Sequence, residues 1–231
     1  MEGESQSAQA QPGCMFERLR TFFRNQDNRS AASEAVSLTR PVGQLRTSRH
    51  GSAKAIGAVL VPIFQRDGTV CVLYTRRAQH LLSHSGEVAF PGGKFDPSDG
   101  DLLDTALRET SEEVGLEREA VEVLGKLPFA GVSRSGVAVT PFVGIVRSLD
   151  SLRPNPAEVA EVFSVPLDAL GDPSRRMPYR HSYADGSNST HPGIKYRGRV
   201  IWGLTLRITM TFLECVERAH EFYRIERSHR A

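Results

Sequence analysis

The sequence predicts an α/β fold, because apolar runs typical of β-strands alternate along the chain with two segments of helical periodicity. The clearest strands are 54–64 and 69–75, and the turn Arg66-Asp67-Gly68 between them predicts a hairpin. The clearest helix is 101–114, in which apolar residues recur at the spacing of one helix face. Gly115 follows it as a natural helix stop. A single domain accounts for this alternation.

The rest of the chain adds further elements to the same domain. Apolar or aromatic-flanked runs predict strands at 121–127, 137–147, 161–165, 178–183 and 194–202. The polar segment 185–193 is predicted to be a loop between the last two strands, and a second core helix is expected from 202 to 216. We therefore expect an N-terminal extension at 1–50, the main domain at 51–216 and a C-terminal helix end or tail at 217–231.

The N-terminal extension has two interpretations. Phe16, Leu19, Phe22 and Phe23 stand at helical spacing, which favours an N-terminal helix that packs on the domain. The run from Met15 is also richer in Arg and Ser, as targeting segments are. Both interpretations stay open at the level of the sequence.

Composition and charge exclude several classes of function. The formal net charge of +2 over 231 residues gives no general attraction for nucleic acid. No run of apolar residues is long enough to span a bilayer, so we expect no membrane partner. The three cysteines, Cys14, Cys71 and Cys215, are too far apart for a CxxC metal pair, and their small number favours a reducing compartment.

The helix 101–114 carries three glutamates on one face, because Glu109, Glu112 and Glu113 stand at i, i+3 and i+4. Adjacent like charges repel, and each such pair costs about a few tenths of a kcal/mol. Arg108 offsets part of this repulsion, and a divalent cation such as Mg²⁺ would offset far more. The alternative is a solvated acidic face. The upstream Gly-Gly turn that ends at Gly93 favours the metal site, because backbone can closely approach a ligand there.

Together these segments resemble a known family. The run from Gly93 through Arg108-Glu109-Thr110-Ser111-Glu112-Glu113-Val114-Gly115-Leu116 resembles the Nudix box, G-x5-E-x7-R-E-U-x-E-E-x-G-U, where U is a bulky apolar residue. Thr110 stands at such an apolar position. Asp99 replaces the first glutamate of the box, and eight residues rather than seven separate it from Arg108.

In the region of these departures, the sequence resembles that of Nudix members that hydrolyse coenzyme A. The shared features are the start Gly92-Gly93-Lys94-Phe95-Asp96-Pro97-Ser98-Asp99, the approach Thr105-Ala106-Leu107-Arg108-Glu109, and the upstream residues Thr75, Arg77, Gly86 and Phe90-Pro91-Gly92-Gly93. Leu82 stands where their upstream motif has an arginine.

The resemblance implies a Nudix fold, a mixed β-sheet sandwiched between helices (α/β/α), with Mg²⁺ as the cofactor and Mn²⁺ as a substitute. It implies that Glu109, Glu113 and the Gly93 carbonyl bind metal, and that Glu112, Arg108 and a late carboxylate serve catalysis. Glu158 is preferred over Glu161 for that carboxylate, because it lies on a loop. Arg76, Arg77 and Lys94 are candidate ligands of the substrate phosphates, with plain solvation of the two arginines as the alternative.

The implied reaction is hydrolysis of the diphosphate bond of coenzyme A or its thioesters, which gives 4′-phosphopantetheine, or its acyl form, and adenosine 3′,5′-bisphosphate. NADH, ADP-ribose or a nucleoside triphosphate are alternative substrates, and a Nudix-fold binding module without activity is an alternative of a different class. The expected partner is therefore a small nucleotide-type molecule, with a homodimer as the assembly. The expected compartment is the mitochondrion, with the cytoplasm as the alternative.

Overall fold

A computed structural model describes residues 12–34, 55–81, 83–129, 131–183 and 186–228. Its main element is an eight-stranded mixed sheet with the central order β3-β2-β1-β7-β5, in which β4 pairs with β1, β6 with β7 and β8 with β2. Its strands are β1 (Ala55–Arg66), β2 (Thr69–Arg77), β3 (Val88–Ala89), β4 (Gly92–Lys94), β5 (Val121–Lys126), β6 (Gly131–Val132), β7 (Val137–Val146) and β8 (Val159–Pro166). The predicted hairpin is confirmed, because β1 and β2 pair antiparallel across Asp67 and Gly68, which both have positive φ.

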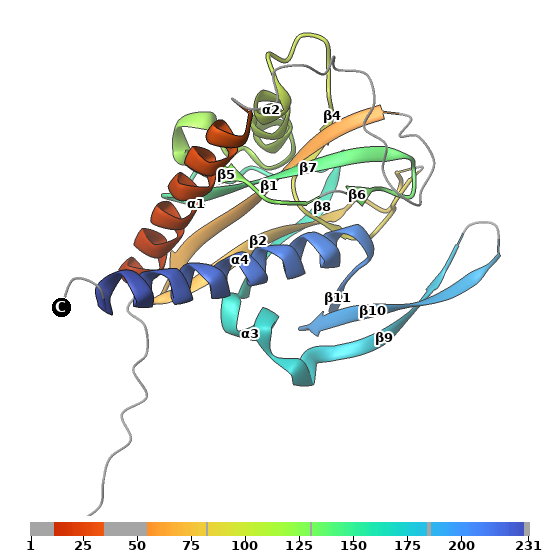
Figure 1. Cartoon of the computed structure of the whole chain (residues 1–231). Helices are drawn as coiled ribbons and strands as arrows, with labels where there is room; N and C mark the ends of the chain where they lie inside the picture. The colour runs from red at the N-terminus through yellow and green to blue at the C-terminus, as the bar shows by residue number, and fades with distance from the viewer. Residues whose placement is uncertain (1–11, 35–54, 82, 130, 184–185, 229–231) are drawn as a thin grey trace, which may run out of the picture.

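Helices cover both faces of this sheet (Figure 1). The helices are α1 (Pro12–Glu34), α2 (Leu102–Val114), α3 (Leu167–Gly171) and α4 (Gly203–Ser228), with short 3₁₀ turns at Arg118–Ala120 and Pro173–Arg175. Successive residues of β1 point to opposite faces, so Leu60 packs with Leu107 of α2 while Val61 packs with Leu19 of α1 and Phe212 of α4. The two cores confirm the predicted α/β/α arrangement.

The helix α1 is joined to the domain by packing and by charge. Leu19, Phe22 and Phe23 are buried in the core that also contains α4. Arg20 donates two hydrogen bonds, of 2.6 and 2.9 Å, to the Glu122 carboxylate on β5. No helix in the described part of the chain is long and apolar enough to cross a membrane.

A second sheet of three strands lies beside the start of α4 (Figure 1). It consists of β9 (Arg176–Ser182), β10 (Asn188–Tyr196) and β11 (Arg199–Trp202), in the order β11-β10-β9. The prediction of a loop over 185–193 was therefore wrong for the segment from Asn188 onward, since Ser and Thr side chains fit an exposed strand as well as a loop. The predicted strand 194–202 is interrupted by a turn at Arg197 and Gly198, both of which have positive φ.

Candidate functional site

The helix α2 brings the predicted glutamates to the edge of the sheet where β4 lies. Asp101 caps its first turn by accepting the Asp104 N–H at 2.8 Å. Gly115 ends it in the left-handed conformation, with φ of 73°, and donates its N–H to Ser111. The bounds are close to the predicted helix 101–114, so the spacing of Glu109, Glu112 and Glu113 on a helix is confirmed.

Glu113 is buried, with 2% of its surface exposed. Its carboxylate accepts the Gly92 N–H at 3.2 Å and lies 3.4 Å from an Arg77 guanidinium nitrogen. Burial raises the pKa of Glu113 to about 7, against the hydrogen bond from Gly92 and the charge of Arg77, and the charges of Glu158 and Glu109 add to the rise. The carboxylate is therefore desolvated without a full counter-charge.

The Gly-Gly turn fits tightly against Glu109. Gly93 lies in β4 opposite Ala58 of β1, and a Cβ at Gly93 would overlap the carboxylate of Glu109. A side chain at this position would therefore displace the Glu109 carboxylate from its place beside the backbone. Burial raises the pKa of Glu109, while the charge of Arg108 lowers it. Glu109 and the Gly93 backbone are thus held together on one side of the site.

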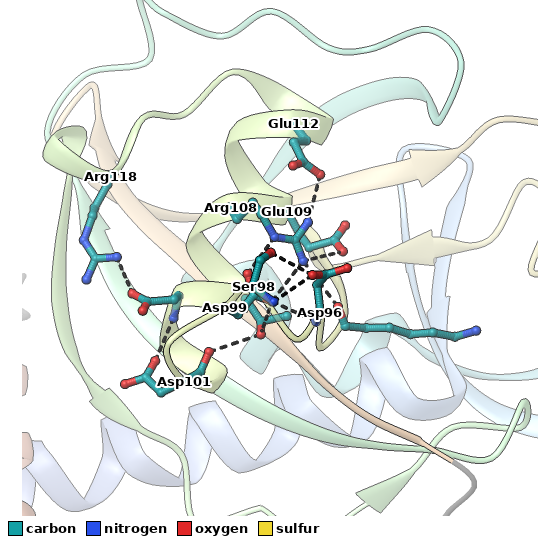
Figure 2. A network of polar contacts seen from close by, with 11 residues as sticks. Asp96, Ser98, Asp99, Asp101, Arg108, Glu109, Glu112 and Arg118 are labelled. Atoms are coloured by element: carbon teal, nitrogen blue, oxygen red, sulfur yellow. Dashed lines mark hydrogen bonds and ion pairs between the residues drawn. The ribbon is translucent and has the colours of Figure 1, made fainter.

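Arg108 is the centre of a polar network (Figure 2). Its Nε and Nη2 donate to the two Asp99 oxygens at 2.8 and 3.1 Å. Its other contacts are Glu112 at 3.0 Å, Glu109 at 3.2 Å and the Lys94 carbonyl at 3.4 Å. The Arg108 guanidinium holds the pKa of Asp99 well below its usual range.

The sequence left the role of Asp99 open, and the structure places it against Arg108. Asp99 also accepts the hydroxyl of Thr105 at 2.8 Å and the Asp96 N–H at 3.0 Å, so both of its oxygens have donors. Asp99 has a shorter side chain than the glutamate of the box, and one extra residue separates it from Arg108. In this position it forms a two-point ion pair with Arg108. An inserted residue alone gives no indication of such a pair.

The two candidates for the late carboxylate differ in their surroundings. Glu161 forms ion pairs with Arg199 and with Arg76, the latter at 3.3 Å, and the hydrogen bond from Arg199 lowers the pKa of Glu161. Glu158 instead acts electrostatically on both Glu109 and Glu113. The charge of Glu158 is thus felt by Glu109 and Glu113, whereas Arg76 is held beside Glu161.

The donor set fits a hard divalent cation. The candidate ligands Glu109 and Glu113 offer carboxylate oxygens and Gly93 offers a backbone carbonyl, which are the ligand types that Mg²⁺ prefers, while the contacts of Glu113 in this structure are N–H donors of Gly92 and Arg77. Within the described residues, no three His, Cys, Asp or Glu side chains already gather at metal-binding spacing. Burial is the main cause of the raised pKa values of Glu109 and Glu113, with a smaller contribution from the neighbouring carboxylates, so both side chains are desolvated.

A cavity of about 750 Å³ lies beside the Gly-Gly turn, and Glu109, Glu113 and Glu158 are not among its lining residues. Its lining includes Arg77, Gly92, Gly93 and Lys94, together with Tyr183, His191, Trp202 and the start of α4. Its size suits a nucleotide-type ligand. Arg77 and Lys94 line it as substrate-binding candidates should, whereas Arg76 is not among its lining residues. Leu82, the departure in the upstream motif, lies outside the described residues.

Comparison with known proteins identifies the family. The model of the NUDIX domain matches residues 54–185. The uncharacterized Nudix hydrolase NudL of Yersinia pestis is 42% identical over 177 residues, covering 75% of this chain and 86% of its own length. The chain belongs to the Nudix family. It is accordingly a Nudix hydrolase, and members of this family generally use divalent metals such as Mg²⁺.

Solved Nudix structures are similar at lower identity. The Nudix hydrolase RenU of M. smegmatis is 21% identical, with a TM-score of 0.44 over 57% of this chain and 84% of its own. The NUDIX domain of Shewanella oneidensis NrtR, complexed with ADP ribose, is 22% identical, with a TM-score of 0.41 over 61% of this chain and 87% of its own. Membership of the family follows from the domain match and the Yersinia relative, not from these structures.

Proposed function

We propose that the protein is a Mg²⁺-dependent diphosphatase of coenzyme A or its thioesters. The products would be 4′-phosphopantetheine, or its acyl form, and adenosine 3′,5′-bisphosphate. One observation carries the proposal: the upstream motif and the glutamate helix meet at a single carboxylate. Arg77 and Gly92, both from segments that resemble coenzyme A-hydrolysing members, contact Glu113 of α2.

The residues around the Gly-Gly turn would hold the cation. Glu109, Glu113 and the Gly93 carbonyl are its proposed ligands, with Glu112 in the same group. When bound, Mg²⁺ (or Mn²⁺ in its place) neutralises phosphate oxygens and lowers the pKa of a coordinated water. Arg108 would orient the ligands without binding the metal. Its hydrogen bonds hold the carboxylates of Glu109 and Glu112, and Asp99 holds Arg108 in place.

The remaining groups bind the substrate and move the proton. Arg77 and Lys94 line the cavity beside the carboxylates and would bind oxygens of the diphosphate. Glu158 would accept a proton from the water that attacks phosphorus, because Glu161 is neutralised by two arginines. The new P–O bond forms as the bond from that phosphorus to the bridging oxygen breaks, and each product leaves with a phosphate group. Positioning and charge account for most of the catalysis.

The test is to incubate the pure protein and Mg²⁺ separately with coenzyme A, NADH and ADP-ribose, and to separate the products by chromatography. We expect adenosine 3′,5′-bisphosphate and 4′-phosphopantetheine from coenzyme A. Coenzyme A that stays intact while NADH or ADP-ribose is cleaved would overturn the proposed substrate and leave the diphosphatase chemistry standing.

A pair of matched variants tests the carboxylate group. Glu113→Gln keeps the shape of the side chain and removes its charge, so we expect activity to fall by about two orders of magnitude or more. Glu119→Gln is the control, because Glu119 is an exposed glutamate in the turn after α2. Full activity of Glu113→Gln would contradict the proposed metal ligands.

A further inference from the structure

A cluster of aromatic and histidine side chains lies on one face of the three-stranded sheet. Tyr179 and His181 stand two residues apart in β9, so they share a face, and Tyr183 continues the spacing. Trp202 of β11 and His191 of β10 complete the cluster. The sequence shows the alternation of Tyr, His and Tyr, but it does not show that Trp202 lies against it.

The rings are arranged around Trp202. Their centroids lie 4.4 Å from it for His181, 5.1 Å for His191 and 5.3 Å for Tyr179. The hydroxyl of Tyr183 lies 2.7 Å from the Nε2 atom of His191. The rings therefore support one another as a group, although none of the five is fully buried.

Two charged residues fix the edges of the cluster. Glu87 lies 3.9 Å from His181 and 3.1 Å from His84, and it belongs to the segment that leads into the Gly-Gly turn. On the outer side, the Arg134 guanidinium carbon lies 3.2 Å from the centroid of the Tyr183 ring. The cluster is thus in contact, through Glu87, with the segment that leads into the Gly-Gly turn.

The cluster faces the substrate cavity. Trp202, His191, Tyr183 and Arg134 line the same cavity as Gly93 and Lys94, whereas Tyr179 and His181 support Trp202 from outside its lining. Half-exposed aromatic rings that line a cavity leave apolar surface in water, which a flat ligand can cover. A molecule whose diphosphate lies at the Gly-Gly turn would extend its nucleoside or its second arm toward these rings.

We propose that this cluster is the binding site for the nucleobase of the substrate, with Trp202 and His191 as the stacking surface. The inference rests on the proposed function only in requiring a nucleoside whose diphosphate is cleaved at the glutamates. Stacking suits a purine because the purine ring is flat and its π-face can lie against the face of an aromatic side chain. Tyr183 and Arg134 form the outer rim, where the guanidinium is also available to a phosphate on the ribose.

The chain contains one tryptophan, so emission excited at wavelengths that tyrosine does not absorb reports Trp202 alone. The test titrates the wild-type protein in EDTA with adenosine 5′-monophosphate and, separately, with ribose 5-phosphate, which differs only in lacking the base. We expect saturable quenching by the adenosine nucleotide and none by ribose 5-phosphate. Equal responses to both would overturn the inference. So would quenching by 4′-phosphopantetheine without quenching by the nucleotide, because the cluster would then hold the other arm.

Variants at Trp202 separate stacking from shape. Trp202→Leu removes the ring, and we expect calorimetry to show adenosine 5′-monophosphate binding weakened by about 5- to 100-fold. Trp202→Phe is the matched control, which keeps an aromatic ring and should retain most of the affinity. Equal affinity of the Leu and Phe variants, with both folded by circular dichroism, would contradict a stacking role.

The titration is independent of coenzyme A hydrolysis. If coenzyme A is not cleaved but the nucleotide quenches Trp202, the proposed substrate fails and the base site stands. If coenzyme A is cleaved and the nucleotide gives no base-dependent signal, the base site fails and the proposed substrate stands.

Discussion

Replacing Glu113 with Gln should stabilise the metal-free protein, although it should lower activity by about two orders of magnitude or more. The side chain is buried, and burial raises the pKa of Glu113 from its ordinary value of 4.5 to about 7. One pKa unit corresponds to about 1.4 kcal/mol, so the ionised carboxylate costs the folded state about 3 kcal/mol at pH 8. Gln can still accept the Gly92 N–H. The loss of the Arg77 partner needs no separate subtraction, because the charge of Arg77 is already among the causes of the pKa of Glu113.

The expected net gain is therefore about 3 kcal/mol, or a rise in melting temperature of roughly 6 to 12 °C for a chain of this size. The sign depends on pH. The stability that protonated Glu113 contributes is present below pH 4.5 and is lost as the pH rises through about 7. The difference between variant and wild type should thus be near zero at pH 4.5, grow up to pH 7 and stay constant above it.

The assay is denaturant unfolding in EDTA across this pH range, repeated with saturating Mg²⁺. Mg²⁺ should stabilise the wild type, because it binds the folded state, and should stabilise Glu113→Gln far less. Glu119→Gln should match the wild type throughout. A variant that is no more stable than the wild type at pH 8 in EDTA, or a pH-independent difference, would refute the account of Glu113.

The remaining predictions concern the metal, the network and the first helix. The affinity for Mg²⁺, measured by calorimetry, should rise by about tenfold per pH unit below pH 7 and level off above it, because the cation must displace the Glu113 proton. An affinity that does not change with pH would contradict this prediction. Asp99→Asn should lower kcat by about tenfold with little change in KM, since an amide cannot accept both Arg108 bonds; an unchanged kcat would count against the network. Gly93→Ala should lower kcat by about 100-fold, because the methyl overlaps Glu109, whereas Gly171→Ala, which meets open space, should be neutral in the same assay. Arg20→Ala should cost about 1 kcal/mol in unfolding experiments at pH 7. Arg20 lowers the pKa of Glu122, so this cost should disappear as the pH falls below 4.5 and through the lowered pKa; a cost that persists in acid would exclude this ion pair as its source.

Local patterns in the sequence predicted most of the main sheet and the helix α2. The turn at Asp67 and Gly68 and the stop at Gly115 are set by the conformations that these residues adopt easily, so neighbouring residues suffice to predict them. The period of the apolar residues likewise shows which face of α2 packs on the sheet. The three glutamates on that helix follow from the same spacing.

The parts that the sequence did not predict depend on contacts between distant segments. The turn at Arg197 and Gly198 was hidden inside an apparently continuous strand, because either residue also occurs within strands. Nothing near Asp99 in the sequence shows that its oxygens face Arg108 across the inserted residue. The aromatic cluster joins β9, β10 and β11, so no single window of the chain contains it.

The most direct test of the proposed function is competition between substrates in one mixture. Equal concentrations of coenzyme A, NADH and ADP-ribose are incubated with the protein and Mg²⁺, and the disappearance of each is followed with time. We predict that coenzyme A is consumed first and that adenosine 3′,5′-bisphosphate accumulates in step with its loss. Consumption of NADH or ADP-ribose while coenzyme A persists would contradict the proposed substrate.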